Sequence, residues 1–282
     1  MSEILHVLYH ALLHTLRDTI SLLPFLFVTY LLMEALEHKA GERVNRFISE
    51  SGKYGPLTGA ILGLLPQCGF SAATAGLFGT GVIGGGTVLA VFLSTSDEMI
   101  PIMLSNGMRA ADIALILALK LGIACLSGFV FSAIVKDKKK DSIGHLCHEE
   151  GCHCERGILP SAIHHTLGVA LFVFVTVFIF EAVIDFVGES VLVSVLSSTP
   201  ILSSVLSALF GLIPGCASSV IITEMYIEGV ISFGALMSGL LTGSGVGILV
   251  LFRTNKNTGE NLKIISALLA VGIVTGILID IF

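Results

Sequence analysis

Apolar runs long enough to cross a lipid bilayer recur along the whole of this 282-residue chain. Only 13% of its residues are charged, against roughly 25% in a soluble domain, and its mean hydropathy is +0.94. Crossing about 30 Å of hydrocarbon takes about 20 apolar residues in a helix. Because the runs are continuous and do not alternate, an outer-membrane β-barrel is excluded. The composition predicts an all-α polytopic membrane protein in the lipid bilayer, with no nucleic-acid partner.

The second half of the chain repeats the first. With a shift of 147 residues, Phe25–Thr29 aligns with Phe172–Thr176, and with a shift of 148, Gly63–Cys68 aligns with Gly211–Cys216. Matches of Pro, Cys and Gly in register do not arise from apolar composition alone, and secondary transporters are commonly built from such repeats. We expect membrane repeat 1 over residues 1–135, a His/Cys-rich cytoplasmic loop over 136–157, and membrane repeat 2 over 158–282.

Basic residues orient the two repeats, because Lys and Arg concentrate in cytoplasmic loops. The loop after the first span carries Lys39, Arg43, Arg46 and Lys53, whereas the equivalent stretch of repeat 2, residues 185–199, has no Lys or Arg. Equivalent loops therefore lie on opposite sides of the cytoplasmic (inner) membrane, which predicts inverted repeats. We expect about ten transmembrane helices (5+5), with both termini on the outer side of this membrane. We expect no cleavable signal peptide. Three crossings plus a re-entrant hairpin in each half give the same parity, so that alternative stays open.

Two proline motifs, Pro66–Gly69 and Pro214–Ala217, predict helix breaks at equivalent places. Broken helices free backbone carbonyls, which are tolerated at membrane depth only beside a cavity or a ligand. Each break also brings a thiol and a hydroxyl, and the first adds an amide. The candidate transport residues at the breaks are Gln67, Cys68, Ser71, Cys216 and Ser219. The alternative is a pair of proline kinks whose small residues pack against neighbouring helices.

Asp97 and Glu98 lie inside an otherwise apolar run, residues 82–104. A carboxylate at bilayer depth costs at least about 2.5 kcal/mol, so such a pair usually faces a cavity and has a function. Repeat 2 has Gly245 and Val246 at these positions, which indicates one cation site with asymmetric donors. Alternatively, one carboxylate carries a proton, or both lie in water at the membrane edge. Ser96 is a further candidate transport residue, and weaker candidates for the lining are Met99, Asn106 and Ser244. Glu34 and Glu181, related by the repeat, are expected at the membrane interface; if they are intramembrane, they are candidates for a proton or second site.

The loop over residues 145–155 is a dense set of metal donors. Thiolates and imidazoles are the ligands that zinc and similar metals prefer, although the paired CxxC spacing of a structural zinc site is missing. We expect a flexible metal collector or sensor on the cytoplasmic side; a polar linker of biased composition is the alternative. The donors are His145, Cys147, His148, Cys152, His153 and Cys154.

At Pro66–Gly69, Ser94–Pro101 and Pro214–Cys216 the chain resembles the prokaryotic ten-span heavy-metal exporter family, whose members are also labelled arsenic efflux permeases or manganese transporters. The resemblance covers nearly the whole chain and implies efflux of a metal or metalloid across the cytoplasmic membrane. The conflicting labels leave the substrate open.

We therefore expect a secondary transporter, not an enzyme, that exports a divalent transition metal such as Mn, Zn or Fe, coupled to protons and with no tightly bound cofactor. No GxxxxGK[ST] motif couples the chain to ATP. Arsenite or an organoarsenical is the rival substrate, and would make Cys68 and Cys216 essential. An intramembrane metalloenzyme lacks support, since neither HExxH nor GxSxG occurs. A metal-sensing channel and a homodimer stay open.

Overall fold

The computed structural model describes residues 54–64, 68–96, 99–135, 158–187 and 200–282, together with scattered positions between Tyr9 and Leu31. In these ranges every regular element is a helix, so the all-α prediction is confirmed there. Several predicted site residues lie outside the described residues: Glu34, Gln67, Asp97, Glu98 and all six metal donors of the 136–157 loop. Cys68 and Glu181 are described as helical residues, but their side chains are not described.

Five described segments are long and apolar enough to cross a membrane: 85–105, 110–134, 162–180, 233–254 and 258–281. Three of them belong to continuous helices, α7 (Ala110–Ile134), α9 (Ile158–Val187) and α15 (Thr258–Ile281). The other two are interrupted near their middle. The first divides into α5 (Gly85–Ser94) and α6 (Met99–Ser105), and the second into α13 (Phe233–Thr242) and α14 (Gly247–Thr254).

Four apolar helices are too short to cross the bilayer alone: α3 (Gly55–Gly63), α4 (Cys68–Gly79), α11 (Pro200–Gly211) and α12 (Ala217–Ile227). At 1.5 Å per residue the longest measures only about 18 Å. The chain breaks between α11 and α12 at residues 212–216, as the Pro214–Ala217 motif predicts. Between α3 and α4 the helix has already resumed at Cys68, and Pro66 lies outside the described ranges.

The duplication seen in the sequence reappears as a duplicated packing. In the first half α5 packs against α3 and α7, and in the second half α13 packs against α11 and α15. A Cβ atom on Gly63 of α3 would meet Val91 O at 2.7 Å and the Ser94 hydroxyl even closer. A Cβ on Gly211 of α11 would collide with Gly239 O and the Thr242 hydroxyl, and these residues lie 148 positions after the first set.

Further glycine pairs follow the same shift. A Cβ on Gly128 would lie 2.8 Å from Gly86 O, and a Cβ on Gly276 would lie 2.6 Å from Gly234 O. Two equivalent turns also use a left-handed glycine, Gly81 with φ 77° and Gly229 with φ 74°. Glycine is needed at these contacts because any side chain would push the two helix backbones apart. The two halves are therefore alike in their backbone contacts as well as in their sequence.

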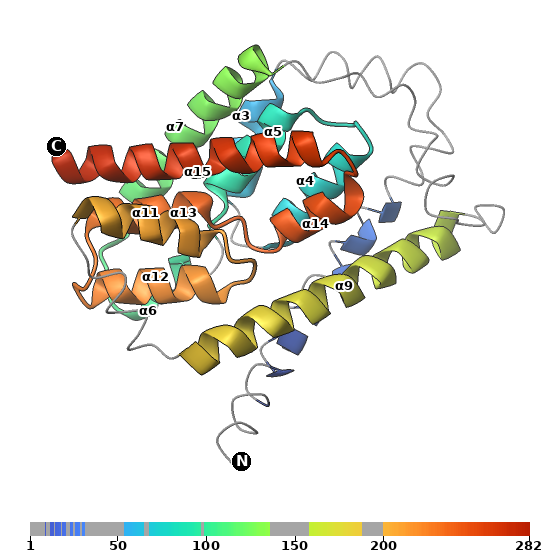
Figure 1. The fold of residues 1–282 in the computed structure, drawn as a ribbon, viewed down its shortest axis with the longest axis horizontal. Coiled ribbons are helices and arrows are strands. Elements are labelled where there is room, and N and C mark those ends of the chain that lie inside the picture. Colours follow the sequence, from blue (N-terminus) through green and yellow to red (C-terminus); the bar gives the residue numbers. More distant parts are fainter. Residues whose placement is uncertain are drawn as a thin grey trace.

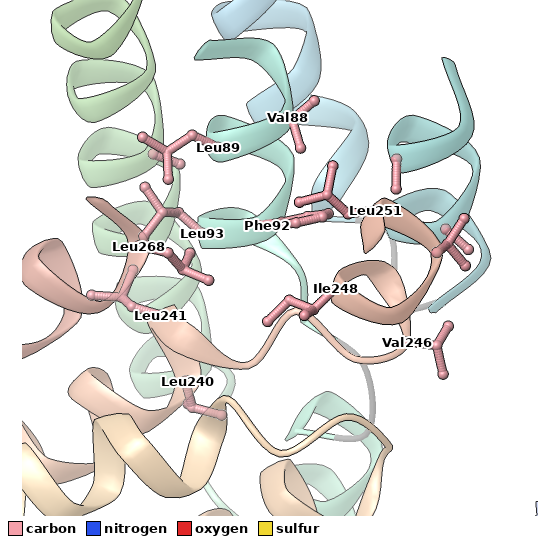
Figure 2. Packing of buried hydrophobic residues seen from close by; sticks show 14 of the residues in the cluster. Val88, Leu89, Phe92, Leu93, Leu240, Leu241, Val246, Ile248, Leu251 and Leu268 are labelled. Atoms are coloured by element: carbon pink, nitrogen blue, oxygen red, sulfur yellow. The ribbon is translucent and has the colours of Figure 1, made fainter. Parts of the chain in front are cut away.

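The halves are joined by the second parts of the interrupted helices. Helix α14 packs against α4, where Thr254 Oγ1 donates to Ala75 O at 3.1 Å, and helix α12 packs against α6. Phe92 of α5 projects toward α14, where Ile248 and Leu251 lie (Figure 2). Helix α9 runs along one side of the molecule (Figure 1) and contacts α14. Each half thus contributes to the environment of the other half's interruption.

Candidate functional site

The first interruption begins with three buried hydroxyl residues. Ser94, Thr95 and Ser96 are 0%, 4% and 1% exposed. Ser94 Oγ and Thr95 Oγ1 donate to Val91 O at 3.1 and 2.7 Å, and Ser96 Oγ donates to Ser94 O at 3.0 Å. Such local bonds compete with the helical ladder and favour a helix end. The sequence then continues through Asp97 and Glu98, outside the described residues, to Met99, which is fully buried.

The second interruption has the same position in its half but different chemistry. Helix α13 ends at Thr242, and Gly245 adopts a left-handed φ of 55°, a conformation that glycine reaches without strain. Ser244, the repeat counterpart of Ser96, is 1% exposed, and its Oγ has no hydrogen-bond partner within the described part of the chain. Because buried hydroxyls usually have a partner, Ser244 is a candidate ligand for an ion or a substrate.

Lys120 joins the two interruptions. It lies in the middle of α7 and is 0% exposed. Its Nζ donates to Leu240 O at 2.8 Å, in the last turn of α13, and also to Thr95 O, directly after α5. One ammonium group therefore lies within hydrogen-bond distance of carbonyls from both halves, which shows that the two interruptions meet at the centre of the molecule.

Sequence reasoning missed Lys120, although a signal was present. It is the only charged residue in the apolar run from Ile113 to Val135. Its repeat counterpart is Leu268, which is fully buried and lies with Leu93 and Leu241 in the core (Figure 2). An intramembrane lysine is a functional-site candidate in its own right, because few membrane helices tolerate one.

The other predicted site residues are placed unevenly. Ser71 on α4 is fully buried and lies against the start of α14, where a Cβ on Gly247 would be 2.9 Å from Ser71 Cβ. Ser219 is 9% exposed and donates to Cys216 O at 2.8 Å, so its hydroxyl closes the first turn of α12. The side chain of Cys216 is half-buried at this helix start. Ser71 thus lies next to the interruption between α13 and α14, whereas the Ser219 hydroxyl forms its hydrogen bond within the break between α11 and α12.

Asn106 is not brought to the centre. It is exposed in the turn after α6 and donates to Ile102 O at 3.0 Å. The same turn carries an exposed ion pair, in which Arg109 Nε lies 2.9 Å from Asp112 Oδ2. The Asp112 carboxylate raises the pKa of Arg109 by accepting its hydrogen bond and by its charge.

The described residues offer mainly oxygen atoms to a ligand. Nowhere in the described ranges do three His, Cys, Asp or Glu side chains come together. What the two interruptions present is a buried set of hydroxyls, helix-end carbonyls and one ammonium, in an apolar surrounding. Interrupted helices that meet at mid-membrane are the usual site of substrate and ion binding in secondary transporters.

Comparison with known protein families identifies one family model, described as "Putative, 10TM heavy-metal exporter", which matches the chain over residues 8–166 and again over 155–282. Comparisons with the curated proteins and with the solved structures gave no match. The two matched regions together cover nearly the whole sequence. The chain therefore belongs to this family of ten-span heavy-metal exporters.

Proposed function

We propose that this protein is a secondary transporter that exports a divalent transition metal across the cytoplasmic membrane in exchange for protons. The observation that carries the proposal is the meeting of two interrupted helices around a buried polar centre, with Lys120 in contact with both. Polar groups at this depth are costly and are kept where they serve a function. The exporter family supports the direction of transport.

Asp97 and Glu98 are the proposed principal ligands. They follow Thr95 by two and three residues, and Thr95 O receives the hydrogen bond of the buried Lys120 ammonium. A buried charge needs a counter-charge, which these carboxylates would supply. Ser96 and Ser244 would add oxygen ligands, which suit a hard or borderline ion such as Mn²⁺, and the thiols of Cys68 and Cys216 would shift the preference toward softer ions.

The charges of the proposed site bear on how metal binding is coupled to protons. Two carboxylates and one ammonium leave one net negative charge, and repeat 2 contributes no charged residue at the equivalent positions, Gly245, Val246 and Leu268. When the proton of one group leaves as the metal enters, the buried site changes its charge by only one unit. Exchange of metal for protons is therefore the coupling that best limits the cost of burying the ion.

We further propose an inverted arrangement of the two halves, each with three crossings and one re-entrant pair. Each helix of the pairs α3–α4 and α11–α12 is too short to span, and with the other helices and the N-terminal segment they would make ten apolar segments, equal to the number of spans in the family description. The exposed Arg253 in the last turn of α14 and Lys256 in the turn that follows would be cytoplasmic, and the turn at Arg109 would be outside.

A trivalent arsenical is the second candidate substrate, favoured by the half-buried Cys216 thiol beside the break between α11 and α12. Arsenite binds thiolates, so this function would depend on Cys68 and Cys216, and Asp97 would then serve mainly as a proton carrier.

Metal accumulation in cells, measured by elemental mass spectrometry, tests the proposal. Cells expressing the wild type, Asp97→Asn or Glu98→Gln are loaded with Mn, Zn, Fe, Co, Cd or arsenite, with Asp112→Asn as a control at an exposed carboxylate. We expect the cellular content of one divalent metal to fall in cells that express the wild type or Asp112→Asn, but not in cells that express Asp97→Asn or Glu98→Gln. If only the arsenic content falls, and Glu98→Gln still exports arsenic while an additional Cys216→Ser variant does not, the protein is an arsenical exporter.

A further inference from the structure

Helices α14 and α6 hold equivalent places in the two halves, each directly after an interruption. Helix α14 leads from the second interruption to the turn that contains Lys256, and α6 leads from the first interruption to the turn at Arg109. In the proposed arrangement these two turns lie on opposite sides of the membrane. Helix α14 would therefore lie between the centre and the cytoplasm, and α6 between the centre and the outer side.

Helix α14 is closed against α4 of the other half (Figure 1). Gly79 and Thr254 are the last residues of these two helices, and a Cβ on Gly79 would lie 2.7 Å from Thr254 Cβ and 2.9 Å from Thr254 O. The turn after α14 is buried as well, since Asn255 is 2% exposed and its amide donates to Asn261 Oδ1 at 2.7 Å. At this end of the molecule the two halves thus meet without room for a side chain at Gly79.

The Thr254 hydroxyl has two acceptors within reach. Thr254 Oγ1 lies 3.1 Å from Ala75 O, across the contact, and 2.8 Å from Val250 O, one turn back in its own helix. A hydroxyl has one proton to donate, so it serves one carbonyl at a time. If α14 moved away from α4, Thr254 would keep the bond to Val250 O, and its hydroxyl would not be left unsatisfied. The contact can therefore open at a low cost in hydrogen bonding.

Asn106, directly after α6, is the repeat counterpart of Thr254 and shows the open form of the same arrangement. Its amide donates to Ile102 O at 3.0 Å, and Ile102 is the counterpart of Val250. Asn106 is exposed, whereas Thr254 is half-buried against α4. The two equivalent residues thus share the bond within their own segment but differ in how far the other half covers them.

Helix α12 packs against α6 as α4 packs against α14, but its sequence makes a close contact harder. Thr223 stands in α12 where α4 has Ala75, and its carbonyl can accept a bond in the same way. Ile227 stands where α4 has Gly79. An isoleucine keeps two helix ends farther apart than a glycine does. The chain therefore favours closure between α4 and α14 over closure between α12 and α6.

We propose that Thr254 and Gly79 form the cytoplasmic gate of the transporter, closed in this structure. Asn106 and Ile227 form the outer gate, and the two gates close in alternation. Alternating access in transporters with inverted repeats comes from such movements of one half against the other around a fixed site. The assignment of sides and the role in transport rest on the proposed function, whereas the exchange of contacts between the two equivalent sites does not.

Disulfide trapping measures each contact directly. The cytoplasmic pair is Gly79→Cys with Thr254→Cys, and the outer pair is Asn106→Cys with Ile227→Cys. A disulfide needs Cβ atoms about 3.5–4.5 Å apart, so the cytoplasmic pair has to separate only slightly to form one. Membranes are oxidised with copper–phenanthroline and cut at a specific protease site inserted after Lys140, between the halves. Halves that stay joined on a non-reducing gel report the cross-link, and single-cysteine variants measure the background of the native cysteines.

Two changes at the cytoplasmic gate test the alternation. Gly79→Ile introduces the residue that the outer gate has, and Thr254→Val removes the hydroxyl but keeps the shape. We expect the cytoplasmic pair to cross-link readily and the outer pair slowly. With either change the outer pair should cross-link about threefold faster or more. Gly122→Ile on α7 is the control, because a Cβ there has nothing within 4 Å, and it should leave the rate unchanged.

The gate is disproved if the cytoplasmic pair does not cross-link, or if the folded Gly79 and Thr254 variants leave the rate of the outer pair unchanged. Failure of both variants to fold also overturns it, because the contact would then be a fixed part of the scaffold. In proteoliposomes, oxidation of the cytoplasmic pair should stop metal flux and a reductant should restore it; continued flux through the cross-linked protein refutes the role in transport. If the wild type exports no metal, the proposed function fails, while the cross-linking rates still decide whether the contacts alternate.

Discussion

The orphan hydroxyl of Ser244 gives a prediction in which stability and function move in opposite directions. Its Oγ is buried and has no partner in the described structure, and an unsatisfied buried hydroxyl costs about 1–3 kcal/mol. Ser244→Ala removes this oxygen with a small loss of volume. We therefore expect the purified protein to be more stable in the absence of substrate, with a melting temperature higher by roughly 2–12 °C, since 1 kcal/mol shifts a chain of this size by about 2–4 °C.

Transport should suffer in the same variant. If Ser244 Oγ completes the coordination of the exported metal, its loss removes one ligand, and about 1.4 kcal/mol of binding corresponds to a tenfold weaker affinity. In proteoliposomes we expect the KM for the metal to rise about tenfold or more in Ser244→Ala.

The chain provides a matched control in Ser207 on α11. Its Oγ is likewise buried without a described partner, but it lies outside the interruptions. Ser207→Ala should be stabilised like Ser244→Ala and should keep the KM of the wild type. The reasoning is refuted if Ser244→Ala melts below the wild type, because the hydroxyl then has a partner. It is refuted for the site if the KM is unchanged, or if it rises equally in the Ser207 variant.

Three further predictions follow. Gly211→Ala should lower the melting temperature strongly or prevent folding, because its Cβ would collide with Gly239 O, whereas Gly122→Ala on α7, with nothing within 4 Å, should be neutral or stabilising in the same scan. Asp280→Asn should destabilise by about 1.5–3 kcal/mol, because Asp280 accepts bonds from two serine hydroxyls and from Gly234 N, and thermal unfolding in detergent measures this. Deleting residues 145–155 should raise the KM for metal export and leave the maximal rate unchanged; complete loss of flux would place this loop in the pathway.

The helical fold could be read from the sequence because the bilayer imposes simple rules. Apolar length specifies the spans, and Pro214 and Gly215 mark the break between α11 and α12. The duplication could be read as well, since the glycines needed for close helix contacts must recur at the same places. Gly63 and Gly211 are such a pair, and both lie in the contact that the repeat predicts.

The composition of the site was harder to predict. Asp97 and Glu98 drew attention as paired charges in an apolar run, but the interruption of α13–α14 carries no charge and was noticed only as the counterpart of the first. Asn106 was included because of its polarity and is exposed in a turn. Ser219 was included for its hydroxyl, which bonds within its own helix start. Residue type shows which groups can bind, but not which way they face.

By itself, then, the sequence determined the membrane class, the duplicated plan and the proline break at residues 212–216. Two physical constraints act through local composition: backbone polar groups must be satisfied in lipid, and closely packed helices need small residues at the contact. The tertiary structure alone decided that both interruptions meet at one lysine. Lys120 is separated from Thr95 by 25 residues and from Leu240 by 120, so no local pattern links them. Only the packing of the two halves brings a side chain of α7 to the carbonyls at the ends of α5 and α13.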